Sequence, residues 1–270
     1  MVVSLHSATS CITALLVVCM PMALTAQVVD DNCAIAIITS VAGDSYVVAT
    51  DGKRNPASPH DTYALEGQTV ETEKNSHLFI VCSNGLGIGI DAQTSLHVKT
   101  FRQTPYTAKR ANLEYEPSTS QLMMELYHGA LSISSKALSP RSQIRIKTLN
   151  GNVRLHTSNC RIEQDDAGTT IISYDGNATF YYPDGVNREF IAKNTAIRIS
   201  PQSAALNEIA EKIDVTTLES NKQTFTDAAA FASNRVFFKA PPEGLAAIPV
   251  LIIPMDTLDR PNVRPYEYLD

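Results

Sequence analysis

Apolar and polar residues alternate in short stretches throughout residues 34–200, and glycine, asparagine, aspartate or proline separates one stretch from the next. In Ser142–Thr148, for example, Ile144 and Ile146 fall on one face of an extended chain and basic residues on the other. Period-two patterning with a turn signal every 8 to 12 residues or so is typical of half-buried antiparallel strands. We therefore expect a mainly β domain over 34–201, built as an antiparallel sandwich or a short β-roll.

Turn residues divide this region into separate predicted strands. Asn84-Gly85 and Asn150-Gly151 predict tight hairpins, because both residue types tolerate positive φ, and His128-Gly129 predicts a further turn. The predicted strands are Ala34–Thr39, Ser45–Ala49, Gln68–Thr72, His77–Cys82, Gly87–Ile90, Ser95–Lys99, Gln121–Tyr127, Ala130–Ser134, Ser142–Thr148, Asn152–His156, Thr169–Tyr174, Ala178–Tyr182, Glu189–Ala192 and Ala196–Ser200.

The pattern changes after Pro201. Apolar residues recur at helical spacing in Ser203–Lys212, with Ser203 as the expected cap, and a second helical pattern covers Thr224–Phe237. These two patterns predict a helical segment over 202–240. Prolines recur in residues 241–270, where each removes a backbone donor and fixes φ, so this tail is expected to be largely extended.

One part of the tail, Ala246–Ile253, is too apolar for a solvated linker. It is expected either to pack back on the domain or to add as a strand to a partner's sheet. The second alternative makes four of its residues candidate partner contacts: Ile248, Val250, Leu251 and Ile252.

The N-terminus holds the longest apolar run, Cys11–Met20, followed by small residues up to Ala26. This run has the length of a signal-peptide core and is too short to span a bilayer. We therefore expect residues 1–26 to be a signal peptide, although no Lys or Arg precedes the run. The alternative is an anchor that is never cut, and only then would the chain contact a membrane.

Charge and cysteine content narrow the function classes. The net charge is −6 and no block of Lys or Arg exists, so nucleic acid is not an expected partner. Export would leave Cys33, Cys82 and Cys160, whose wide spacing matches no zinc pattern. Core packing explains them, and one disulfide is the alternative.

Candidate chemistry is sparse. None of the six His forms a zincin pair with a Glu, and no Gly-x-Ser-x-Gly elbow is present. We therefore expect no catalytic, cofactor-binding or metal residues, and no enzyme activity. The aromatic run Phe180-Tyr181-Tyr182 is the main surface candidate, since one face of that strand can pack in the core while the other contacts protein or sugar.

The order of several motifs between Val41 and Pro201 resembles the FecR family, including a version in exported proteins of Verrucomicrobia-like bacteria. His156-Thr157-Ser158 and Cys160 stand where the family usually has Arg-Gly-Thr and an aromatic, which makes this a divergent member. The motifs are Leu65–Thr72, Asn75–Ser76, Ser83–Ile88, Thr94–Val98, Phe101–Tyr106, Glu116–Ser120, Leu126–Leu131 and Lys136–Thr148.

This resemblance implies a periplasmic or secreted bacterial protein with a β-rich domain that binds other proteins. Founding members relay a signal from an outer-membrane receptor to a cytoplasmic sigma factor by means of an N-terminal cytoplasmic segment and a membrane helix. We expect neither segment here unless residues 1–26 are an uncleaved anchor, so sigma-factor control is not part of the expectation. We expect an exported, non-enzymatic protein that mediates protein–protein interaction or signalling in the cell envelope, with an envelope protein as its partner. The competing interpretation is a carbohydrate- or peptidoglycan-binding module.

Overall fold

The computed structural model describes residues 34–104, 118–135, 138–206, 211–213, 237–239 and 248–250. The fold is mainly β, as the alternating pattern predicts. In the first half, the strands are β1 (Ala36–Ala42), β2 (Ser45–Val48), β3 (Arg54–Pro56), β4 (Thr62–Tyr63), β5 (Thr69–Thr72), β6 (His77–Cys82), β7 (Gly87–Ile90) and β8 (Ser95–Gln103). The strands that follow are β9 (Ser120–Ser134), β10 (Gln143–Thr148), β11 (Gly151–Asp165), β12 (Gly168–Tyr181), β13 (Arg188–Ile191), β14 (Thr195–Ile199) and β15 (Glu211–Ile213).

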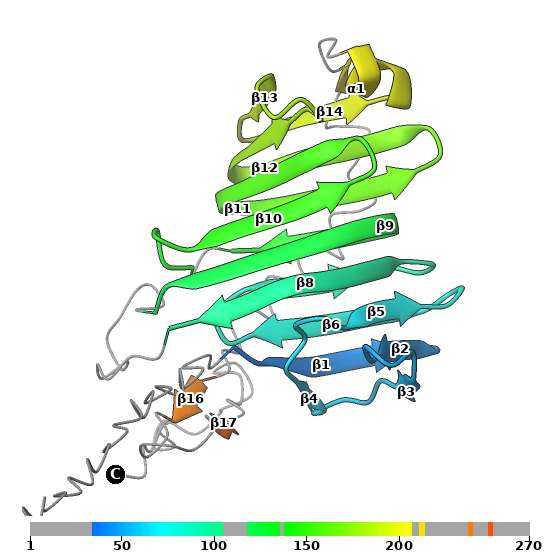
Figure 1. The fold of residues 1–270 in the computed structure, drawn as a ribbon, viewed down its shortest axis with the longest axis vertical. Helices are drawn as coiled ribbons and strands as arrows, with labels where there is room; N and C mark the ends of the chain where they lie inside the picture. Colours follow the sequence, from blue (N-terminus) through cyan, green and yellow to red (C-terminus); the bar gives the residue numbers. More distant parts are fainter. Residues whose placement is uncertain are drawn as a thin grey trace, which may run out of the picture. The chain divides into compact units, whose positions relative to one another are not determined.

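Fifteen strands form one hydrogen-bonded network, and its pairings divide into two sheets. Sheet 1 has the order β3-β2-β5-β8-β9-β10-β11-β12-β13, and sheet 2 has the order β4-β1-β6-β7-β9-β11-β12-β14-β15. In Figure 1 the colour runs from blue through green to yellow along the stack, because each later segment adds beside earlier ones. The predicted sandwich or roll is consistent with this arrangement.

Three long strands belong to both sheets. The first half of β9 pairs with β8 and β10, whereas its second half, from Gly129 on, pairs with β7 and β11. β11 and β12 change sheets in the same way, and the ladder between them is irregular between Leu155 and Ser158, where β11 crosses. An extra residue on one strand bends it, so the irregularity allows the crossing.

Side chains facing inward from both sheets fill one apolar core. Alternation produces this directly: in β10 Ile144 and Ile146 are buried, while Gln143, Arg145 and Lys147 are exposed. Cys82 and Cys160 are free and fully buried in the same core, and burial raises the pKa of each thiol to about 12. Packing is therefore confirmed for these two cysteines, while Cys33 lies outside the described residues.

Gly129 shapes the corner at which β9 changes sheets. Its φ is +94°, and a side chain there would overlap Thr94, whose Cα would lie 2.5 Å from an added Cβ. The Thr94 hydroxyl also accepts a hydrogen bond from the backbone N–H of Ala130 at 3.0 Å. The predicted turn at His128-Gly129 is therefore wrong in kind: it is a bend inside one continuous strand.

The end of the domain departs from the predicted helices. Helix α1 covers only Pro201–Leu206, and Ser200 caps it by accepting a hydrogen bond from the Ser203 N–H at 3.0 Å. Glu211–Ile213 forms β15 on the open edge of β14, so the predicted helix to Lys212 is wrong there. The second predicted helix lies outside the described residues, apart from its last residue, Phe237, which begins a strand.

Two short strands come from the C-terminal region. β16 (Phe237–Lys239) pairs antiparallel with β17 (Ile248–Val250). Part of the apolar segment predicted to pack back or to add to a partner thus pairs within this chain. Leu251 and Ile252 lie outside the described residues.

We predict that Gly129→Ala lowers the free energy of unfolding by at least about 3 kcal/mol, because positive φ and steric overlap both oppose the new methyl group. Gly52→Ala is the matched control: Gly52 has φ +82° but no atom within 4 Å of an added Cβ. That control should cost about 1 kcal/mol. Urea denaturation of both variants measures the difference, and equal losses would show that the corner is not tightly packed.

Candidate functional site

The outer face of sheet 1 carries two adjacent rows of side chains, each formed by residues opposite one another on neighbouring strands. Such residues have Cβ atoms about 4.5–5.5 Å apart, so each row is a line of contacts across the sheet. The first row is Thr69, His97, Glu125, Lys147, Asn152, Tyr181 and Arg188. The second row is Thr100, Met123, Arg145, Arg154, Thr179 and Phe190.

Glu125 neutralises the basic residues at the centre of the first row. Its Oε1 lies 3.3 Å from Lys147 Nζ and 4.0 Å from Lys99 Nζ, and its Oε2 accepts a hydrogen bond from the Tyr127 hydroxyl at 3.2 Å. Burial alone would raise the pKa of the Glu125 carboxyl, but Lys147, Tyr127 and Lys99 together lower it. This part of the face is therefore electrostatically satisfied within the protein.

The second row has no such balance. Arg145 and Arg154 lie directly opposite each other on β10 and β11, and neither forms an ion pair with a carboxylate of the described residues. Beside them, His156 Nε2 lies 3.1 Å from Thr179 Oγ1. Burial, and then the charge of Arg154, lowers the pKa of His156. The second row therefore carries two adjacent positive charges that no carboxylate of the described residues neutralises.

The aromatic residues predicted as partner contacts separate by face. Phe180 and Tyr182 are 0% and 2% exposed, and their rings meet edge-to-face in the core with centroids 5.1 Å apart. Tyr181 points outward in the first row and is half-buried. The proposed aromatic contact thus reduces to Tyr181, because burial removes the other two rings from any partner.

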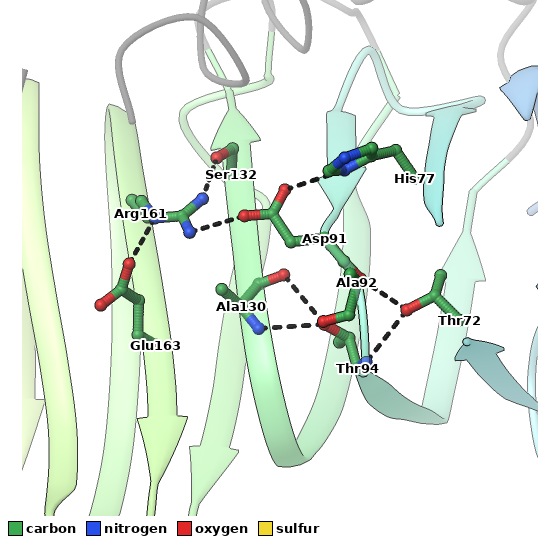
Figure 2. Close-up of polar contacts among 9 residues, drawn as sticks. All are labelled: Thr72, His77, Asp91, Ala92, Thr94, Ala130, Ser132, Arg161 and Glu163. Carbon is green, nitrogen blue, oxygen red and sulfur yellow. Dashed lines mark hydrogen bonds and ion pairs between the residues drawn. The ribbon is translucent and has the colours of Figure 1, made fainter. Parts of the chain in front are cut away.

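A buried ion-pair network joins β11 to the segment between β7 and β8 (Figure 2). Arg161, whose side chain is only 6% exposed, places Nη2 2.5 Å from Asp91 Oδ2 and Nε 2.6 Å from Glu163 Oε1. Its Nη1 donates a hydrogen bond to Ser132 Oγ on β9 at 3.1 Å. The guanidinium therefore connects three segments far apart in sequence.

The two carboxylates keep this arginine charged. Burial alone would lower the pKa of the Arg161 guanidinium, but Asp91 and Glu163 more than offset burial and raise it. Asp91 Oδ1 accepts no hydrogen bond, and the His77 imidazole lies 3.7 Å from it on the exposed side. Alternation of apolar residues could not have revealed this network, because Arg161 and its main partner Asp91 lie 70 positions apart along the sequence.

A threonine relay closes the same end of the sandwich. The Thr72 hydroxyl accepts a hydrogen bond from the Thr94 N–H at 2.9 Å and donates one to the Asp91 carbonyl at 2.5 Å. Figure 2 shows this relay beside the ion pairs, with Thr94 reaching Ala130 on β9. Together the two networks position the crossings between the sheets, which is a structural role.

The described part of the chain offers neither a metal site nor a membrane-spanning helix. No group of three or more His, Cys, Asp or Glu side chains there is arranged to hold a metal ion. Likewise, no helix within those residues is long and apolar enough to cross a membrane.

Similarity to known proteins supports the resemblance seen in the motifs. Residues 68–179 match the FecR protein family. This FecR region extends from the residue before β5 into the second half of β12, and so contains β9, β11 and nearly all of β12. The strands β1–β4 and β13–β15 lie outside the match and extend both sheets at their edges.

Solved structures show only a distant likeness. Two crystal structures of a Parabacteroides distasonis ATCC 8503 protein assigned as an anti-sigma factor, at 2.50 and 1.65 Å resolution, align with TM-scores of 0.42 and 0.40. Each is 12% identical, and the alignment covers 57% of this chain and 64% of that protein. No curated protein matches the sequence.

We predict that Arg161→Met lowers the free energy of unfolding by about 3 kcal/mol, the lower end of the range for breaking a buried ion pair, because Asp91 and Glu163 are 17% and 30% exposed and then lose their cation. Adding Asp91→Asn to that variant should recover part of the loss, since it removes one of the stranded charges. Urea denaturation of the single and double variants measures both effects. A loss below about 1 kcal/mol for Arg161→Met would contradict the network's structural role.

Proposed function

We propose that this chain is an exported, non-enzymatic bacterial protein that regulates a cell-envelope process by binding another protein. The match of residues 68–179 to the FecR protein family supports a role in signalling or regulation. The signal peptide expected over residues 1–26 supports export. In this proposal the FecR region is a protein-binding module and has no direct control over a sigma factor.

The observation that carries the proposal is the difference between the two sheets. Sheet 2 has buried side chains on its outward positions as well, including Ile37, Val81 and Ile172. Sheet 1 instead presents rows of charged, polar and aromatic side chains on its outer face, of which Arg145, Lys147, Arg188 and Phe190 are exposed. A partner can therefore reach sheet 1 without unfolding any of the described structure.

The tail belongs to the proposal as a second contact. Ile248 and Val250 lie in β17, which is a short strand paired on one side with β16, and Leu251 and Ile252 follow it. An apolar strand of this kind can extend a partner's sheet by backbone hydrogen bonds. Together with Tyr181, these four residues form the proposed contact set.

The glycan-binding alternative is less well supported by the geometry. A sugar-binding face needs exposed rings on which sugars can stack. Phe180 and Tyr182 are buried in the core, and the centre of the sheet 1 face is occupied by the ion pairs of Glu125. Charged and aromatic groups in this mixture are more typical of a protein interface.

The test is site-specific photocrosslinking in the native host. A benzoylphenylalanine residue replaces Tyr127 or Tyr181 on the outer face of sheet 1, or replaces exposed Asp166 in the turn between β11 and β12 as the control. We expect one defined protein adduct from both sheet 1 positions and none from Asp166. Mass spectrometry then identifies the adduct.

Two outcomes would contradict the proposal. Crosslinks only to wall polymer would establish the glycan-binding alternative. Equal crosslinking from Asp166 would show that sheet 1 is not the binding face. A truncated variant that ends at Ala240 measures the contribution of the tail. Removing the tail should reduce the yield of the protein adduct.

A further inference from the structure

Three arginines and two aromatic rings gather at one end of the outer face of sheet 1. We define the arginine–aromatic patch as Arg145, Arg154 and Arg188 with Tyr181 and Phe190. They come from the adjacent strands β10, β11, β12 and β13, and the pairings Arg145 with Arg154 and Tyr181 with Arg188 bring them together. This patch stands out because the chain as a whole carries a net charge of −6.

The arginine pair is unfavourable for the isolated protein. Like charges on directly opposite residues of neighbouring strands are destabilising. The nearest carboxylate of the first row, Glu125, is already occupied by Lys147 and Lys99. Among the residues the structure describes, no acidic side chain pairs with Arg145, Arg154 or Arg188. An anionic group from outside the chain would relieve this repulsion.

Exposed apolar groups adjoin the charges. Phe190 is 64% exposed on β13, and Val186 in the turn before it is 80% exposed. β13 pairs only with β12 in the described structure, so it is the open edge of sheet 1. Arginine and aromatic side chains are the types that dominate binding energy at protein interfaces. The patch therefore offers both charge and apolar area to a single ligand.

We propose that the arginine–aromatic patch binds an acidic segment of the partner protein, an inference that rests on the proposed protein-binding function. Carboxylates of the segment pair with the guanidinium groups, which bind carboxylates in bidentate geometry. An apolar side chain of the same segment packs on Phe190. Two strand spacings separate β11 from β13, about 10 Å, so the carboxylate and the apolar residue are about two to four residues apart in an extended segment.

The test uses a defined probe and the full-length protein. The probe is a short fluorescein-labelled peptide in which glutamates flank phenylalanine at that spacing, and its counterpart has glutamine at every glutamate. Fluorescence anisotropy measures both affinities at low and at physiological salt. We expect the glutamate peptide to bind at least about tenfold more tightly and to weaken as salt rises, because salt screens exposed charges.

Variants locate the binding site. Arg145→Gln with Arg154→Gln should weaken binding of the glutamate peptide by about tenfold or more, and Phe190→Ser should weaken it as well. The control is Lys53→Gln with Lys74→Gln, which removes the same charge from exposed turn positions next to β3 and β5, at the other end of the sheet 1 strand order. That control should bind as the parent does. The arginine double variant should also keep or raise its thermal unfolding midpoint, because a repulsive pair is lost.

Several outcomes would overturn the inference. The first is equal affinity for the glutamate and glutamine peptides, and the second is an unchanged affinity of the arginine double variant for the glutamate peptide. The third is that phosphatidylglycerol vesicles or heparin displace the labelled peptide more effectively than unlabelled peptide does. Failure here is separable from failure of the proposed function. If photocrosslinking at Tyr127 still captures a protein in the arginine double variant, sheet 1 binds its partner outside this patch. If that capture also fails in the parent, the protein-binding function itself is wrong.

Discussion

The structure depends on three strands that belong to two sheets at once. β9, β11 and β12 each pair with different neighbours in their two halves, so the sheets are joined by continuous hydrogen-bonded backbone and not by loops alone. A strand can change sheets only where its backbone bends, and the bends use Gly129 and the irregularity beyond Leu155. Near these bends, Arg161 on β11 pairs with Asp91, and the Thr94 hydroxyl accepts a hydrogen bond from the Ala130 N–H on β9. Both contacts fix the segment between β7 and β8 to the bent strands.

This construction determines which surface of the described structure is open to solvent. The inward positions of both sheets form one core, and some outward residues of sheet 2, including Ile37, Val81 and Ile172, are buried as well. Within the described residues, the outer face of sheet 1 presents long rows of charged and polar side chains, and strand pairing fixes their spacing. The FecR region supplies most of these rows, whereas β13, which carries Phe190, lies beyond the matched residues. The proposed binding face therefore combines side chains from the matched region with one edge strand from outside it.

Much of the fold follows from local pattern. The hairpins at Asn84-Gly85 and Asn150-Gly151 are confirmed, because tight turns encode their own geometry, and the second one also sets Arg145 opposite Arg154. Local pattern does not distinguish a turn from a bend within a strand, because glycine is common in both. The sequence therefore predicts a turn at Gly129, where the structure has a bend within β9. The Arg161 network joins distant segments, so period and spacing contain no signal for it. The predicted length of the helix that starts near Ser203 was wrong, because Glu211–Ile213 instead pairs as a strand with the open edge of β14.

Native-state hydrogen exchange tests the central claim, that the shared strands make the two sheets one cooperative unit. The amides to compare are those of Leu122–Leu126 in the sheet 1 half of β9 and Leu131–Ser134 in its sheet 2 half. If the two sheets unfold together, the slowest amides of both halves exchange with the same free energy, equal to that of global unfolding. A sheet 2 half that stays protected while the sheet 1 half exchanges through a lower-energy opening would contradict it.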